Sequence, residues 1–329
     1  MRFLVALLLL APAFGQSATA ALPTMVSPHD AIRVREFYRL AARIQAQIWP
    51  DWDKVPAPML LVTDDAEFLT HHPAPPKEFT KVGDDAYARP RKFPTNFLAT
   101  FPAFGPPAVI VIGEPKNTES KTSTPWLIAL MHEHFHQLQY SRPGYYTAVE
   151  GLGLSHGDQT GMWMLNYPFP YEKLEVVEGF SHLRDLLLTA VTVKSDREFA
   201  RLANWYIAER QKFLARLSPD DHKYFSFQLW QEGVARYTQI MAAEAAASYQ
   251  PTAEYAALSD FESFASYGAR ARQETLDELK QADLAKWKRL AFYSFGGAEG
   301  LLLDRLNPKW KSEYFQHMFS TDSYFEVPH

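Results

Sequence analysis

The sequence predicts an α+β protein in which a small N-terminal lobe with short strands packs on a larger, predominantly helical lobe. Two patterns support this class. Before about residue 120, short apolar or alternating runs are bounded by Pro and Gly, which is typical of strands. After Thr124, apolar residues recur at helical spacing. With 47% apolar and 14% aromatic residues, the 329-residue chain can fill a sizeable core.

Residues 1–20, "MRFLVALLLLAPAFGQSATA", have the features of a secretory signal peptide. Arg2 precedes an apolar run over residues 3–10 that is too short to span a bilayer as a mature helix. The ending "ATA" resembles an A-x-A cleavage site. We therefore expect an exported protein, periplasmic or secreted. No long apolar segment follows, so we expect no stable membrane insertion.

The charge and the cysteine count exclude several classes of function. The net charge of −5 gives no electrostatic footprint for nucleic acid or an anionic membrane surface. Because the chain has no Cys, it can form neither a disulfide nor a thiolate metal site, and it has no Cys nucleophile.

The N-terminal lobe is expected over residues 21–120. Ser27 as N-cap and Pro28 in the first turn predict a helix over 27–49. The Pro-rich stretch 71–94 is expected to be a surface loop. Short apolar runs predict three strands, at 58–63, 96–104 and 108–113.

The second lobe, residues 121–329, is expected to be helical. Residues 155–171 are an exception, since this stretch is rich in Gly, Pro and aromatics and is expected to be an ordered segment that contacts substrate. The periodicity predicts helices at 124–140, 173–193, 196–216, 221–247, 252–281 with a break, and 285–305.

The first of these helices carries three histidines. Thr124 as N-cap and Pro125 at the first helical position set its start. At about 100° per residue, His132 and His136 lie only about 40° apart on one face, where both rings can hold one metal ion. His134 lies about 200° from His132 and cannot join that site.

The segment from His132 to His136 has the pattern H-E-x-x-H, in which Glu133 lies beside the ion and can reach a water bound to it. In this pattern the chain resembles the zincin metallopeptidases. The resemblance implies that His132 and His136 bind Zn²⁺ and that Glu133 is the general base of a hydrolase.

A catalytic zinc site needs a third protein ligand, with the fourth position left for water. No His follows His136 at the metzincin spacing, so we expect a carboxylate. Three acidic residues that each precede Gly are candidates: Glu150, Glu178 and Glu232.

We favour Glu232, because a carboxylate in the middle of an apolar helical segment is costly unless a cation or metal pairs with it. The stretch "EGVARY" also resembles the segment that carries the glutamate ligand in gluzincins, the zincin branch that includes aminopeptidases. The 95 residues between His136 and Glu232 depart from that family, which leaves Glu178 and Glu150 open.

The expected function is that of an exported zinc-dependent metallopeptidase acting on a peptide or protein substrate, with no nucleic-acid partner. Tyr293 is the favoured donor to the oxyanion, and Tyr237 is the other candidate. The run 98–104 suits an edge strand to which substrate adds. Two alternatives remain: a non-catalytic exported module that binds through the aromatics of 162–171, and a zinc amidohydrolase of a non-peptide substrate.

Overall fold

The structure is a computed structural model that describes residues 25–158 and 160–325. The predicted signal peptide, residues 1–20, lies outside the described residues. The chain has the predicted α+β fold, with a mixed sheet in its N-terminal part and helices beyond it. It divides into two compact units. The first comprises the described residues up to Arg43, Asp53–Gln137 and Gln250–Ser263, and the second comprises Ile44–Trp52, Leu138–Tyr249 and the described residues from Phe264 onward.

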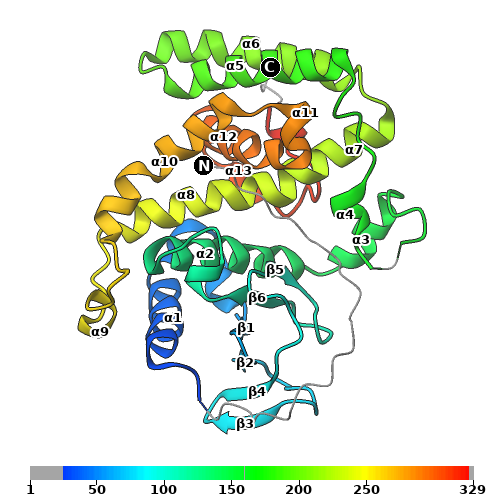
Figure 1. The fold of residues 1–329 in the computed structure, drawn as a ribbon. Coiled ribbons are helices and arrows are strands. Elements are labelled where there is room, and N and C mark those ends of the chain that lie inside the picture. The colour runs from blue at the N-terminus through cyan, green and yellow to red at the C-terminus, as the bar shows by residue number, and fades with distance from the viewer. Residues whose placement is uncertain (1–24, 159, 326–329) are drawn as a thin grey trace. The chain divides into compact units, whose positions relative to one another are not determined.

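The first unit contains a six-stranded sheet with the order β3-β4-β2-β1-β6-β5 (Figure 1). Strands β1 and β6 are parallel, and the other neighbouring pairs are antiparallel. Strand β5 is therefore an edge strand, paired on one side with β6. The strands are β1 Met59–Val62, β2 Ala66–Thr70, β3 Thr80–Gly83, β4 Ala86–Pro90, β5 Leu98–Phe101 and β6 Val109–Gly113.

The surface loop predicted over 71–94 is wrong, because β3 and β4 lie within it. A buried ion pair holds these residues to the sheet: Arg89 on β4 donates from Nε to Glu67 on β2 at 2.6 Å, and the backbone N–H of Lys92 donates to the same carboxylate. The prolines lie outside the two strands or at the last residue of β4, so they leave the ladder intact.

Two long helices accompany the sheet, α1 (Pro28–Ile48) and α2 (Ser123–Tyr140), and each continues into the second unit. The predicted cap of α1 is confirmed, since Ser27 Oγ accepts from the backbone N–H of Asp30. The predicted cap of α2 is wrong, because that helix already begins at Ser123 and Thr124 Oγ1 donates instead to the carbonyl of Glu262.

The second unit is helical and, like the first, contains no described helix that is long and apolar enough to cross a membrane. Helix α9 (Ala253–Ala256) belongs to the first unit. The elements of the second unit are α3 Tyr145–Gly151, α4 Trp163–Asn166, α5 Leu174–Thr192, α6 Asp196–Leu214, α7 Pro219–Gln228, the π-helical turn Leu229–Gly233, α8 Val234–Ala246, α10 Phe264–Gln281, α11 Leu284–Trp287, α12 Ala291–Leu306, α13 Trp310–Glu313, and the 3₁₀ turns Lys288–Leu290 and Asp322–Phe325.

The buried helix α12 contacts α5, α8, α10 and the π-helical turn (Figure 1). Glycines make this approach possible. A Cβ placed on Gly233 would lie 2.6 Å from the Cα of Gly296, and a Cβ on Gly300 would lie 2.6 Å from the ring of Tyr237. The "GGAEG" stretch of α12 is therefore a helix-packing surface, where backbones meet without side chains between them.

The single helix predicted over 221–247 is wrong in its middle, where the π-helical turn Leu229–Gly233 separates α7 from α8. Helical periodicity does not reveal such a turn. The turn interrupts the pattern only once, and the apolar residues before it and after it each keep nearly the same helical spacing. The turn contains Glu232.

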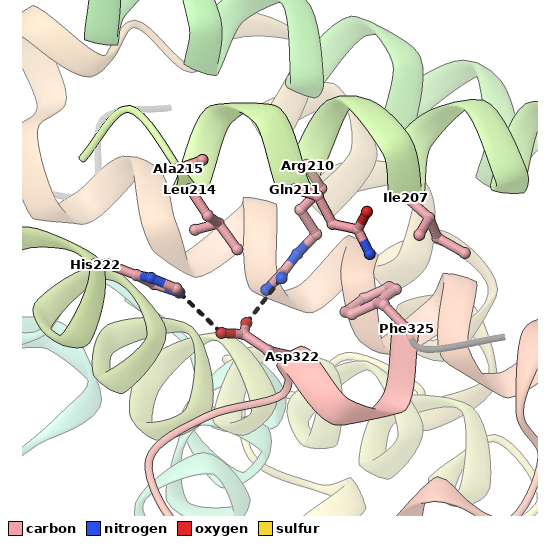
Figure 2. Close-up of a pocket in the computed structure, with 8 residues that line it drawn as sticks. All are labelled: Ile207, Arg210, Gln211, Leu214, Ala215, His222, Asp322 and Phe325. Carbon is pink, nitrogen blue, oxygen red and sulfur yellow. Dashed lines mark hydrogen bonds and ion pairs between the residues drawn. The ribbon is translucent and has the colours of Figure 1, made fainter. Parts of the chain in front are cut away.

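A surface pocket of about 290 Å³ lies where the C-terminal 3₁₀ turn meets α6 and α7 (Figure 2). Its charged groups are paired with one another: Asp322 accepts from Arg210 Nη1 at 2.7 Å and lies 2.9 Å from His222 Nε2. Arg210, which is buried, also donates from Nε to the buried Glu299. This network fixes the end of the described chain against α6, α7 and α12.

The network predicts a stability effect that depends on pH. Burial alone would raise the pKa of Asp322, but Arg210 and His222 outweigh it and hold that pKa well below its ordinary value. Asp322→Asn should therefore lower the free energy of unfolding by about 1–3 kcal/mol at pH 7. The difference should shrink as the pH falls below the ordinary carboxyl pKa of about 3.9, because the native carboxylate then loses its advantage.

Urea unfolding at pH 7 and pH 3 measures this difference. The matched control is Asp185→Asn, whose carboxylate is 66% exposed beside Arg184 and should change stability by less than about 0.5 kcal/mol. An equal destabilisation by Asp322→Asn at both pH values would contradict the assignment.

Candidate metal centre

Two buried imidazoles lie one turn apart on α2. The rings of His132 and His136 have their centroids 4.9 Å apart and stand nearly perpendicular, at 78°. Both side chains are buried, 7% and 5% exposed, on a helix whose other buried residues include Leu127, Leu130 and Met131. Imidazole pairs spaced in this way are suited to hold a divalent ion between them.

His134, between them in sequence, has a structural role. Its Nδ1 lies 2.8 Å from Gln137 Oε1, and its ring meets Phe37 edge to face at 6.2 Å. Burial lowers the pKa of His134 to about 4, although the hydrogen bond with Gln137 opposes this shift. The ring is therefore neutral at neutral pH. The Gln137 amide in turn donates to the carbonyls of Pro58 and Ala108, which fixes α2 to the sheet.

Glu133 is 6% exposed and is held by a strand residue. Thr100, on the edge strand β5, places its hydroxyl 2.8 Å from Glu133 Oε2 and 3.1 Å from the Glu133 carbonyl. Sequence reasoning missed Thr100, because only the pairing of β5 with β6 brings it to the helix. The one available signal was its position within the predicted edge run 98–104.

Glu232 lies on the π-helical turn, and its carboxylate is 17% exposed. Side chains from other elements hold the two residues that precede Glu232 in this turn. The amide of Gln139, at the end of α2, donates to the carbonyls of Trp230 and Gln231 at 3.0 and 3.1 Å. Tyr145 donates to Gln231 Oε1 at 2.8 Å. Gln139 is thus a supporting residue of the candidate site.

His132, His136 and Glu232 each offer a ligand atom within 4.8 Å of the others, and they form the group of potential metal ligands found among the described residues. The competing candidates Glu150 and Glu178 are exposed and lie outside this group. Two imidazole nitrogens and one carboxylate oxygen are the donor set of many catalytic zinc sites. The chemistry of the residues present therefore fits a zinc ion.

The two tyrosines considered as oxyanion donors differ in their surroundings. Tyr237 donates to both carboxylate oxygens of Asp304, at 2.9 and 2.7 Å, so its hydroxyl is already engaged. The hydroxyl of Tyr293 accepts from Arg289 Nη1 at 2.9 Å, and the same nitrogen lies 3.9 Å from Glu232 Oε1. Burial raises the pKa of Tyr293, and the Glu232 carboxylate, to which its hydroxyl is hydrogen-bonded, acts in the same direction, so the hydroxyl stays protonated.

Comparison with known proteins adds no relative to this description: no family model, no curated protein and no solved structure matches the chain.

The geometry predicts that Glu232 contributes to metal affinity and that Glu178 does not. Glu232→Gln should weaken zinc binding by more than the roughly 10–100-fold that loss of a supporting partner costs, because an anionic ligand is replaced by a neutral amide. Titration of the metal-free protein with zinc, followed by calorimetry, measures the affinity. Glu178→Gln is the matched control, with the same chemical change on the exposed face of α5. Equal zinc affinity in both variants would remove Glu232 from the site.

Proposed function

We propose that the chain is an exported zinc-dependent peptidase that hydrolyses peptide bonds. The observation that carries the proposal is the grouping of His132, His136 and Glu232, with Glu133 next to the pair on the same helix. A site that only bound metal would not need a carboxylate at this offset. The signal-peptide features of residues 1–20 support the exported location.

When bound, zinc would polarise the scissile carbonyl and make water more acidic. Glu133 takes a proton from the attacking water as the water oxygen bonds to the carbonyl carbon. Glu133 then delivers that proton to the leaving amine nitrogen as the C–N bond breaks. Thr100 keeps the carboxylate of Glu133 oriented for both transfers. Tyr293 donates its hydroxyl hydrogen to the oxyanion that develops on the carbonyl oxygen.

Substrate is proposed to add as an extended strand to the outer edge of β5. This edge strand carries Thr100, so a peptide paired there would run past Glu133. Main-chain hydrogen bonds to an edge give affinity without demanding a particular side chain, which suits a peptidase of broad specificity. Pro102, just beyond the strand, lacks the N–H needed to continue the ladder.

The alternative of a binding module is less well supported. Three of the four aromatics in 162–171, Trp163, Tyr167 and Phe169, are at most 9% exposed and pack against residues of α7 and its neighbours. Buried rings of this kind stabilise the fold and offer little surface to a partner.

The test compares the zinc-loaded native protein with Glu133→Gln by digestion of a mixed peptide library, read by mass spectrometry. Cleavage should fall roughly 10²–10⁴-fold in the variant, because the proton acceptor is lost. Zinc content should stay at the native level, because Glu133 is not a ligand. Glu119→Gln, an identical change at an exposed residue of the first unit, should cleave at the native rate. Equal cleavage by native protein and Glu133→Gln would refute the proposed chemistry.

A further inference from the structure

Arg289 has a partly unused guanidinium beside the candidate metal ligand Glu232. The side chain is 12% exposed, and among the described residues its one hydrogen bond goes to the Tyr293 hydroxyl. Its distance of 3.9 Å from Glu232 Oε1 is too long for a hydrogen bond. Arg272 differs from Arg289 in this respect, because two of its nitrogens donate hydrogen bonds to the Glu244 carboxylate at 2.6 and 2.8 Å. Arg289 therefore keeps N–H donors for a further partner.

The backbone places Arg289 there at a cost in strain. Lys288, the preceding residue, has φ 51° and ψ −132°, a left-handed conformation that residues other than glycine rarely adopt. The side chain of Lys288 is exposed and lies 3.9 Å from the exposed Glu172, so its own contacts do not account for the strain. The turn does set Arg289 one helical turn before Tyr293, with both side chains on one face.

Besides the Glu232 carboxylate, the groups that interact with this guanidinium are the phenol hydroxyls of Tyr293 and Tyr224. Burial raises the pKa of Tyr224 to about 12, while Arg289 acts in the opposite direction and lowers it. Arg289 has the same effect on Tyr171, whose hydroxyl lies 3.4 Å from that of Tyr224. Tyr171 ends the segment 155–171 that the sequence predicts to contact substrate. Phenols can donate to an anion but do not neutralise a guanidinium.

The charges leave this site with a positive excess. If Glu232 binds zinc, its negative charge and that of Glu133 balance the ion, and the charge of Arg289 remains. A buried charge without a partner is costly, and the group best able to satisfy an Arg fork is a carboxylate, which accepts two parallel hydrogen bonds.

We propose that Arg289 binds a carboxylate of the substrate and so selects peptides with a negative charge close to the scissile bond. The inference rests on the proposed function for the position of that bond. The carboxylate can be the free C-terminus or an acidic side chain, because both present the same oxygens. Arg289 is then a specificity-determining residue. Loss of its side chain should weaken binding of acidic peptides and leave neutral peptides unaffected.

Calorimetry on the zinc-loaded Glu133→Gln protein tests this without turnover. The probes are trialanine, its C-terminal amide, and an amide of the same length that ends in aspartate. We expect trialanine, the aspartyl amide or both to bind at least tenfold more tightly than the neutral amide, and the pattern identifies the source of the carboxylate. Adding Arg289→Gln should abolish the preference, and Arg289→Lys should retain part of it.

Arg270→Gln, which removes an equivalent charge from the exposed face of α10, is the control and should keep the preference. Thermal unfolding and zinc content, measured for each variant, distinguish a lost contact from lost folding or lost metal. Equal affinity for all three probes, or a preference that survives Arg289→Gln, would overturn the inference. If the native protein cleaves no peptide but the preference for probes with a carboxylate still depends on Arg289, the proposed peptidase function is wrong and the carboxylate-binding role of Arg289 stands.

Discussion

The candidate metal centre depends on the buried side-chain amide of Gln139. This amide joins the last turn of α2 to the π-helical turn by donating to the carbonyls of Trp230 and Gln231, the two residues before Glu232. It also lies 2.8 Å from the hydroxyl of Tyr314, which itself donates to the Trp230 carbonyl. His136 lies three residues before Gln139 on the same helix, close to one turn away. A buried amide left without these partners would be costly, so the arrangement has few alternatives.

Close packing of α12 is a second constraint on the π-helical turn that carries Glu232. The contact between Gly233 and Gly296 lets the backbones of the π-helical turn and α12 touch, which side chains at either position would prevent. Tyr293 lies one turn before Gly296, so the same contact brings its hydroxyl, and Arg289 with it, to Glu232. Three features that are unfavourable by themselves thus converge on one carboxylate: a π-helical turn, a glycine pair and a left-handed Lys288. Such features persist only where the surrounding structure holds them.

The local part of this arrangement could be predicted from the sequence, and the rest could not. The spacing of His132 and His136 is a property of a single helix, so the sequence is enough to predict their proximity. The sequence also favours Glu232, because a carboxylate in an apolar helical segment needs a partner. Thr100 and Arg289 cannot be predicted in this way, because strand pairing and a strained turn, which leave no periodic signal, bring them to Glu133 and Glu232.

The β-strand errors have a related cause. Strands β3 and β4 cannot be recognised in the sequence because prolines flank them. When strands are only four or five residues long, turn residues dominate the sequence pattern. The buried Glu67–Arg89 pair that holds them joins residues 22 positions apart and has no local signature. The first compact unit also extends as far as Gln137, because that amide binds carbonyls next to the sheet strands.

The zinc-edge X-ray absorption spectrum of the zinc-loaded protein tests the central assignment most directly. Zinc held by His132, His136 and Glu232 should have two imidazole nitrogens and a carboxylate oxygen at about 2.0–2.2 Å, with one further light atom. In His136→Ala the imidazole contribution should fall to a single ring. A native spectrum without imidazole scattering, or one that His136→Ala leaves unchanged, would contradict the account.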